Sequence, residues 1–542
     1  MLRKSPILSV LLFGCATRAP VTPVAMSAAY VATAEGAPKE ELSWATFSPE
    51  TFARAKAEHK LIVMDGSAEW CHWCHVMEAT TYHDPKVRKL LAARFIAVKV
   101  DIDSRPDLAE RYGDYGWPAT VLFSPDANEI GKYRGYIAPE RFATILKSAT
   151  STTDTEAASS IGVSRPAPDQ PLAEETLAFI EHFTRVELDE YWDDEEGGWG
   201  KSQKAPVSSD NTWMLWRGFV GHDAGAQRRA LFTLDQQAKL LDPVWGGIYQ
   251  YSAAKDWEHP HFEKLLTFQA GAIESYALAY RYTKDEKQLA RARLVRGYID
   301  RFLRGPEGGF YTTQDADLNA HDRAHPFLDG HAFYALDAKG RDARGVPRVD
   351  TNEYGRDNGV GIAAYVALYE ATTDADVLAS ARKAADRTLA THRTARGGIA
   401  HGPVKEEPKQ LFLSDNAAFG WGLVRLNEAR QDATYLAAAR AIGDVLLADF
   451  VDTSGGGLFA STKDPDAVGV FATRRVPFED NVTALRFLAY LAKATKDPRY
   501  EHAIKRILRA ISTPEEIKAR GRWLGDYLLA LEETKKSEYR VP

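Results

Sequence analysis

The spacing of apolar residues divides the chain into an N-terminal α/β region and a longer helical region. Residues 61–64 form a continuous apolar run, which is typical of a strand buried on both faces. Residues 96–102 alternate, with apolar side chains at Ile96, Val98, Val100 and Ile102, as a strand does. Between them, apolar residues at helical spacing predict one helix that reaches about Arg94. Residues 43–150 are therefore predicted to form a compact α/β domain.

Residues 172–542 instead carry long helical patterns and an internal repeat. Helical hairpins with glycine pairs in their return loops recur, which predicts an α/α toroid. An Asp-Asn pair opens a helix four times, at Asp210-Asn211, Asp357-Asn358, Asp415-Asn416 and Asp480-Asn481. Each pair taken alone is interpreted as an N-cap on one rim of the toroid, because both side chains accept hydrogen bonds from free backbone N–H groups.

The N-terminus has the composition of an export signal. Residues 1–34 contain no acidic side chain, and a basic start precedes an apolar run that ends at Cys15. This run is too short to span a bilayer. Its Leu-x-Gly-Cys end is similar to a bacterial lipobox, so residues 1–15 are predicted to be a signal that leaves Cys15 lipidated, followed by a flexible stretch at 16–42. A signal cut near residues 25–29 and an organellar transit peptide are the alternatives.

Composition restricts the partners of the chain. Its 542 residues are too many for one ordinary core, so at least two domains are expected, with residues 151–171 as a Ser/Thr/Ala/Pro-rich linker. A net charge of −7 gives no basic patch for nucleic acid or for a membrane surface. We expect an exported, periplasmic or cell-envelope protein that contacts the membrane only through a lipid anchor.

The candidate chemistry centres on a Cys-x-x-Cys pair, Cys71 and Cys74, placed between the first strand and the helix. A thiolate is the nucleophile in disulfide exchange, and the N-terminus of a helix supplies positive potential that lowers a thiol pKa. His72 and His75 add positive charge when protonated. Cys71 is therefore predicted to attack, and Cys74, one turn later, to resolve the mixed disulfide.

Two further features support a redox site. Asp65 lies in the strand six residues before Cys71, where a buried carboxyl group can exchange a proton with Cys74. Trp117-Pro118 precedes another predicted strand and is a natural place for a cis-proline that shapes the substrate groove.

The cysteines have two competing interpretations. Cys71 to His75 is literally a Cys-x-x-Cys-His string, the pattern of covalent haem attachment, but haem needs an open, largely helical pocket. Cys71, Cys74, His75 and His83 could bind zinc, yet no second Cys-x-x-Cys completes a structural site. We therefore predict a redox dithiol with no metal and no cofactor.

The same residues carry a family resemblance. DGSAEWCHWC, the KVDID strand and GWPATVLF resemble a thioredoxin fold across residues 43–150. CHWCHVM, together with residues 245–266 and 307–317, is similar to the family typified by spermatogenesis-associated protein 20. This resemblance implies a thioredoxin-like α/β domain followed by an all-α six-hairpin (α/α)6 barrel. Residues 318–356 depart from the pattern of that family.

A toroid of this type could process carbohydrate, which needs paired carboxylates at a defined separation. Candidate polar residues for a ligand-binding bowl are His261, Glu263, Asp315, Asp317, Asp415, Glu479 and Asp480. Carboxylates at helix starts are usually caps, so we predict a bowl that binds a carbohydrate or small metabolite rather than an active glycosidase.

The functional prediction is an exported thiol–disulfide oxidoreductase that acts on protein thiols or disulfides. Cys71, Cys74, Asp65, Pro118 and His72 form its predicted catalytic set. The alternatives are a carbohydrate-binding or carbohydrate-processing toroid with an accessory thioredoxin-like module, and a non-catalytic scaffold.

Overall fold

The computed structural model describes residues 42–149, 172–322 and 324–535. The predicted signal, the lipidation site Cys15, the stretch at 16–41 and all of the 151–171 linker lie outside the described residues. Within the described ranges, no helix combines the length and the apolar character needed to cross a membrane.

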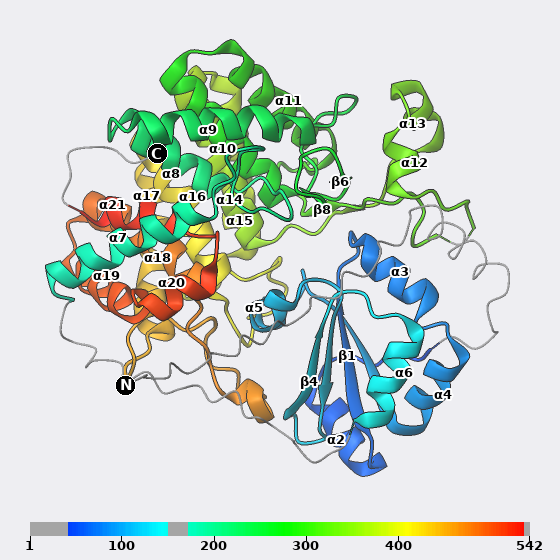
Figure 1. Ribbon diagram of the computed structural model, residues 1–542. Helices are drawn as coiled ribbons and strands as arrows, with labels where there is room; N and C mark the ends of the chain where they lie inside the picture. Colours follow the sequence, from blue (N-terminus) through cyan, green and yellow to red (C-terminus); the bar gives the residue numbers. More distant parts are fainter. Residues whose placement is uncertain (1–41, 150–171, 323, 536–542) are drawn as a thin grey trace, which may run out of the picture.

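The N-terminal domain is a four-stranded sheet in the order β2-β1-β3-β4, with helices on both faces (Figure 1). Strand β1 pairs in parallel with β2 and antiparallel with β3, and β3 pairs antiparallel with β4. The strands are β1 (Leu61–Ser67), β2 (Phe95–Asp101), β3 (Ala119–Phe123) and β4 (Glu129–Arg134). The helices are α2 (Pro49–Glu58), α3 (His72–Thr80), α4 (Pro85–Arg94), α5 (Pro106–Tyr112), η1 (Gly113–Tyr115) and α6 (Pro139–Ser148).

The prediction of one continuous helix as far as Arg94 is wrong, because α3 ends at Thr80 and α4 begins at Pro85. Asp84 caps α4: its Oδ1 accepts hydrogen bonds from the N–H groups of Lys86 and Val87 at 2.8 and 3.0 Å. Proline in the first turn suits this start, since it has no N–H to leave unpaired.

The C-terminal region forms six helical hairpins that close into a ring, which confirms the predicted fold class. Each inner helix packs on the next one, and the last packs on the first. The inner helices are α8 (Ser208–Phe219), α10 (Leu266–Thr283), α14 (Gly355–Thr372), α16 (Leu413–Arg430), α18 (Phe478–Thr495) and α21 (Gly525–Thr534). The outer helices are α7 (Glu174–Glu190), α9 (Ala224–Gln237), α11 (Glu286–Phe302), α15 (Ala375–His392), α17 (Ala433–Val445) and α19 (Pro498–Ile511).

Short elements join the hairpins. The helical ones are η2 (Ala238–Leu240), α12 (Gly330–Tyr334), α13 (Ala338–Arg344), η3 (Leu446–Phe450), η4 (Gly469–Ala472) and α20 (Pro514–Arg520). The strands are β5 (Tyr251–Ser252), β6 (Pro260–His261), β7 (Lys264–Leu265), β8 (Thr313–Gln314) and β9 (Val349–Asp350).

The Asp-Asn pairs do not cap their own helices, so their interpretation as N-caps is wrong. Asp415 and Asn416 lie inside the first turn of α16. The side chain of Asn416 bonds both the N–H and the C=O of Ile399, the residue after a glycine pair, at 2.8 and 3.0 Å. Asp415 instead accepts a hydrogen bond from the N–H of Arg356, at the start of the neighbouring inner helix α14, at 2.8 Å. Two other asparagines make the same pair of bonds to the backbone N–H and C=O of one residue: Asn358 bonds Phe310, and Asn481 bonds Leu458. We call this pair of bonds the asparagine clip.

Asp210 makes the matching contact that closes the ring. Its Oδ1 accepts a hydrogen bond from the N–H of Gly525 at 2.8 Å, which links α8 to α21. The pairs therefore fasten inner helices to loops and to one another.

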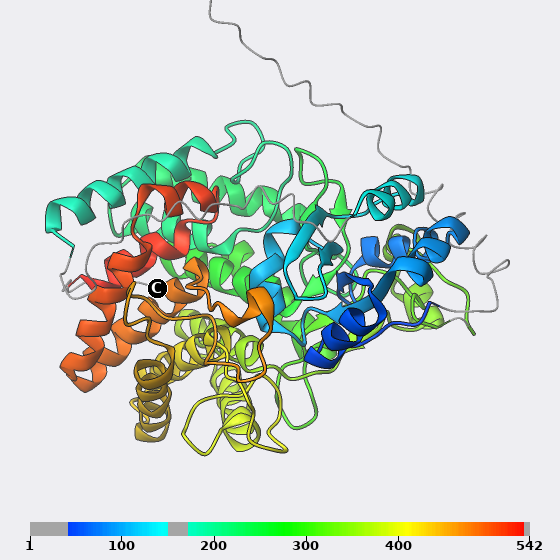
Figure 2. The same ribbon diagram turned by 90° about the horizontal axis from the view of Figure 1, so that it is seen from below.

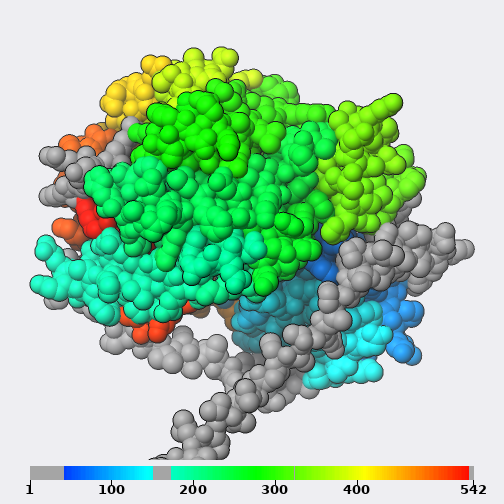
Figure 3. Space-filling model, turned by 45° about the horizontal axis from the view of Figure 1, so that its top comes forward, coloured from blue at the N-terminus to red at the C-terminus, as the bar shows by residue number. Residues whose placement is uncertain are grey.

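The N-terminal domain packs against one end of the toroid (Figures 1 and 2). On one side, η4 places Phe471 against Phe47, Phe52 and Phe123, at ring-centroid distances of 5.1, 6.4 and 5.7 Å. On the other side, the segment that carries α12 and α13 lies over the N-terminal domain, as the yellow-green atoms in Figure 3 show. The N-terminal domain therefore contacts the toroid on two sides.

Candidate functional site at the domain interface

The two cysteines lie at the start of α3, where Cys71 is the N-cap residue. They are joined by a disulfide, and Cys71 Sγ accepts a hydrogen bond from the N–H of Cys74 at 3.2 Å. Cys71 is 3% exposed and Cys74 is 7% exposed. Their apolar cluster includes Trp70, Trp73 and Trp117, and also Leu265 of the toroid. The dithiol is therefore buried where the two domains meet.

The other predicted redox residues lie in the same domain. The Trp117–Pro118 peptide bond is cis, as expected from the sequence. Asp65 is buried in β1, and its Oδ1 has no hydrogen-bond partner among the described residues. Burial raises the pKa of Asp65 to about 6, although the charge of Lys99 opposes the rise. A carboxyl group with such a pKa can exchange a proton near neutral pH.

Three residues predicted for the bowl instead hold the start of α3. His72 Nδ1 lies 2.8 Å from Asp317 Oδ2, and the His72 N–H donates to Glu263 Oε1 at 3.3 Å. His75 Nδ1 lies 3.1 Å from the same Asp317 oxygen, and His75 Nε2 is 3.7 Å from Asp315 Oδ2. Glu263, Asp315 and Asp317 are all buried.

These contacts set the charge of the two histidines. Burial lowers the pKa of each imidazole, but the adjacent carboxylates outweigh it. Asp317 raises the pKa of His72 above its ordinary value, and Asp315 and Asp317 raise the pKa of His75 to about 9. The same contacts hold the pKa of Asp317 far below its ordinary value despite burial. Burial is the main cause that raises the pKa of Asp315 to about 7.

His261 belongs to this interface as well. Its ring stacks on Tyr251 at a centroid distance of 4.3 Å and lies 6.4 Å from the ring of Trp73. His261 Nδ1 is 3.9 Å from Glu263 Oε2. The toroid thus presents an aromatic and acidic surface to the residues around the dithiol.

A second contact reaches the loop after β2. His401 Nε2 lies 2.7 Å from the carbonyl oxygen of Asp103, and its Nδ1 is 3.1 Å from Asp415. The Asp103 carboxylate accepts a hydrogen bond from Trp70 Nε1 at 2.7 Å. Withdrawal from water and the charge of Asp101 raise the pKa of Asp103. Sequence patterns do not single out His401, a lone histidine in a loop. Asp103 ends the KVDID segment, but nothing in that pattern indicates a contact with the toroid.

Asp480 takes no part in either cluster among the described hydrogen bonds; it is half-buried in the first turn of α18. Glu479 is exposed and pairs with Arg520 at 2.8 Å.

The zinc set considered from the sequence is not assembled. Cys71 and Cys74 bond to each other, and His83 Nδ1 lies 2.6 Å from the carbonyl oxygen of Glu78. Among the described residues, the group that could hold a metal ion is His75, Asp315 and His321.

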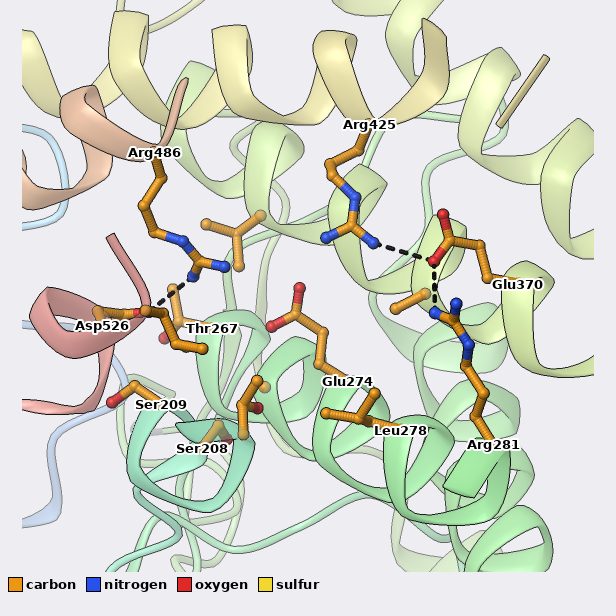
Figure 4. Close-up of a pocket in the computed structure, with 15 residues that line it drawn as sticks. Ser208, Ser209, Thr267, Glu274, Leu278, Arg281, Glu370, Arg425, Arg486 and Asp526 are labelled. Carbon is orange, nitrogen blue, oxygen red and sulfur yellow. Dashed lines mark hydrogen bonds and ion pairs between the residues drawn. The ribbon is translucent and has the colours of Figure 1, made fainter. Parts of the chain in front are cut away.

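The toroid encloses a central cavity of about 190 Å³ that the predicted bowl residues do not line (Figure 4). Charged side chains from five inner helices, α10, α14, α16, α18 and α21, face it. Arg425 and Arg281 both pair with Glu370, at 3.1 and 3.2 Å, and Arg486 pairs with Asp526 at 2.8 Å. The sequence signal for this cavity is the presence of charged residues within otherwise apolar helices.

The folds and the site define a class of protein: a thioredoxin-like domain whose Cys-x-x-Cys helix packs on an (α/α)6 toroid. Residues 25–154 match the family described as Thioredox_DsbH, "Protein of unknown function, DUF255". Thioredoxin H-type from Fagopyrum esculentum is 38% identical over 86 residues, which cover 16% of this chain and 70% of that protein. Through its N-terminal domain, the chain belongs to the thioredoxin family.

The similarity to curated proteins continues into the toroid. Spermatogenesis-associated protein 20 from Homo sapiens is 30% identical over 313 residues, which are 51% of this chain and 39% of that protein. The match therefore spans about two fifths of the length of that relative. The crystal structure of D-mannose isomerase superposes with a TM-score of 0.51 at 13% identity, and covers 67% of this chain and 97% of that one. This likeness shows the toroid fold.

Proposed function

We propose that the protein is a thiol–disulfide oxidoreductase in which Cys71 attacks and Cys74 resolves. The observation that carries the proposal is the position of Cys71 at the N-cap of α3, where its sulfur accepts the N–H of Cys74. Helix N-termini stabilise thiolates in this position. Similarity to a protein named "Thiol:disulfide interchange protein DsbD" from Cronobacter sakazakii, 31% identical over 129 residues, supports it.

The proposed thiol–disulfide exchange has two steps. The Cys71 thiolate attacks a substrate disulfide and forms a mixed disulfide, releasing one substrate thiolate. Cys74 then displaces the second substrate sulfur, so that the protein becomes oxidised and the substrate takes two electrons and two protons. In this proposal Asp65 accepts the proton of Cys74, because its raised pKa suits that transfer.

Burial of the dithiol adds a requirement for access. A protein substrate reaches Cys71 only when the toroid surface around Leu265 moves away, whereas a small disulfide needs a smaller opening. We therefore expect the full chain to reduce a small disulfide faster than it reduces insulin.

The test uses the reduced full chain with both substrates. Cys71→Ser should abolish reduction, and Cys74→Ser should accumulate a mixed disulfide that mass spectrometry detects. Cys15→Ser is the matched control and should retain activity. Equal rates for wild type and Cys71→Ser would overturn the proposal.

We also propose export with a lipid anchor at Cys15, supported by the basic, acid-free N-terminus and its Leu-x-Gly-Cys sequence. Cell fractionation tests it: Cys15→Ser should move the protein from the membrane fraction to the released fraction. Retention of that variant in the membrane fraction would contradict lipidation.

A second candidate function is the binding of a sugar or other small polar molecule in the central cavity. Glu274 of α10 and Arg425 of α16 both line this cavity (Figure 4). The D-mannose isomerase fold is a precedent for sugar chemistry on such a toroid. The cavity of about 190 Å³ is smaller than the roughly 300–1,000 Å³ of usual ligand pockets, so only a small ligand would fit. A thermal-shift screen of monosaccharides against wild type and Glu274→Gln tests this function.

A further inference from the structure

We propose that His75, Asp315 and His321 bind a divalent transition-metal ion that ties the two domains together. His75 comes from α3 of the thioredoxin-like domain, whereas Asp315 and His321 come from the toroid segment that follows β8. Two imidazole nitrogens and one carboxylate oxygen are a donor set that suits zinc.

The spacing of the donor atoms fits a single ion. His75 Nε2 and His321 Nε2 are 3.2 Å apart, and they lie 3.7 and 3.6 Å from Asp315 Oδ2. In a tetrahedral zinc site with bonds of about 2.0–2.1 Å, donor atoms are about 3.3–3.4 Å apart. The three side chains therefore need only small adjustments to surround one ion.

A buried carboxylate oxygen of Asp315 lacks a hydrogen-bond partner in the described part of the chain. The residue is 2% exposed, and its Oδ2 atom has no hydrogen-bond partner among the described residues. A buried carboxylate oxygen without a partner is costly, and a cation between it and the two imidazoles removes that cost.

Asp317 gives His75 the orientation that metal-binding histidines usually have. His75 Nδ1 lies 3.1 Å from Asp317 Oδ2, and Asp317 Oδ1 is fixed by the N–H of Gly330 at 2.8 Å. When Nδ1 donates to this carboxylate, the lone pair of Nε2 is free to bind a metal. Asp317 is thus a positioning residue for the site.

A metal-free arrangement competes with this one. The carbonyl oxygen of Glu69 lies 3.0 Å from His75 Nε2 and 2.9 Å from His321 Nε2, so both rings could donate to it. That arrangement makes His75 a cation between two aspartates and still leaves Asp315 Oδ2 without a hydrogen bond. With a metal, the same carbonyl oxygen becomes an available fourth donor.

The site also has an entry path. The His321 side chain is 30% exposed, while His75 and Asp315 are buried behind it. An ion can therefore reach the two buried donors from the side of His321.

The experiment uses the full chain, purified without a histidine tag and stripped with a chelator. We expect it to bind one Zn²⁺ per chain by elemental analysis, and Co²⁺ to give the intense visible absorption of tetrahedral coordination. His321→Ala should lose most of this affinity, and Asp317→Asn should weaken it by about 10–100-fold, as loss of an outer-shell partner does.

Two controls make the result decisive. His325→Ala removes an exposed histidine in the same loop, which pairs with Asp322, and should leave metal binding unchanged. Cys71→Ser/Cys74→Ser should also bind metal normally, which separates this site from the proposed thiol chemistry. Binding that is absent in the wild type, or equal in wild type and His321→Ala, would overturn the proposal.

Discussion

Replacing Asp65 with asparagine should stabilise the protein in a pH-dependent way. Asp65 is 4% exposed, and burial raises its pKa from 3.8 to about 6. The neighbouring charges are Lys99, which lowers the pKa, and Glu78, which raises it. The folded protein therefore holds a proton on Asp65 between pH 3.8 and about 6, whereas the unfolded chain has lost it.

This difference in protonation sets the direction and the size of the change in unfolding free energy. Because the folded-state pKa is raised, the stabilising effect of the proton is complete below pH 3.8 and is lost as pH rises to about 6. A shift of about 2 pKa units at about 1.4 kcal/mol per unit costs the wild type about 3 kcal/mol above pH 6. The amide side chain of the variant carries no charge at any of these pH values. The stability gain of Asp65→Asn should therefore grow from near zero at about pH 4 to about 3 kcal/mol at about pH 7.

Urea unfolding of the full chain, followed by tryptophan fluorescence between about pH 4 and about pH 8, measures this difference. Asp114→Asn changes an exposed carboxyl group in the same domain and is the matched control. A gain that is the same at both ends of this range, or a variant less stable than the wild type at neutral pH, would refute the reasoning.

Three further substitutions test the toroid by urea unfolding. Asn416→Ala removes the asparagine clip to the glycine loop and leaves buried backbone groups unpaired, so it should cost about 2–4 kcal/mol. Gly359→Ala should cost about 1–3 kcal/mol of unfolding free energy, because the added methyl group overlaps the backbone of α16. In the control Gly297→Ala the methyl group meets open space, so this variant should stabilise α11 slightly. Lys264→Met should cost about 3 kcal/mol, since it leaves the buried carboxylate of Asp242 with one fewer partner; near-wild-type stability would contradict the ion pair at 2.7 Å.

Local periodicity was enough to predict much of the fold. The apolar run at 61–64 and the alternation at 96–102 correspond to β1 and β2. Strand β1 is buried on both faces, as a continuous apolar run predicts, and β2 is buried as well except at the half-buried Lys99 and Asp101. The break between α3 and α4 was missed because apolar residues continue at helical spacing through both helices. Asp84-Pro85 carried the signal for a new helix start.

The interface could not be predicted in the same way. Cys71 lies at a strand-to-helix junction that sequence identifies, but His72 meets Asp317 across 245 positions of the chain. No local pattern reports such a contact. His321 lies in the 318–356 stretch that departs from the family pattern, so neither periodicity nor resemblance indicated its position beside His75.

The hydrogen bond between Gly525 and Asp210 has a consequence for the order of folding. It joins residues 315 positions apart, so the ring cannot close until nearly all of the toroid has been synthesised. The sheet of the N-terminal domain needs only residues 61–134, all of which emerge much earlier. We therefore expect the nascent chain to pass through a stage in which the thioredoxin-like domain is folded but its dithiol is still uncovered. At that stage the dithiol is more accessible to oxidants and to protein partners than in the finished protein.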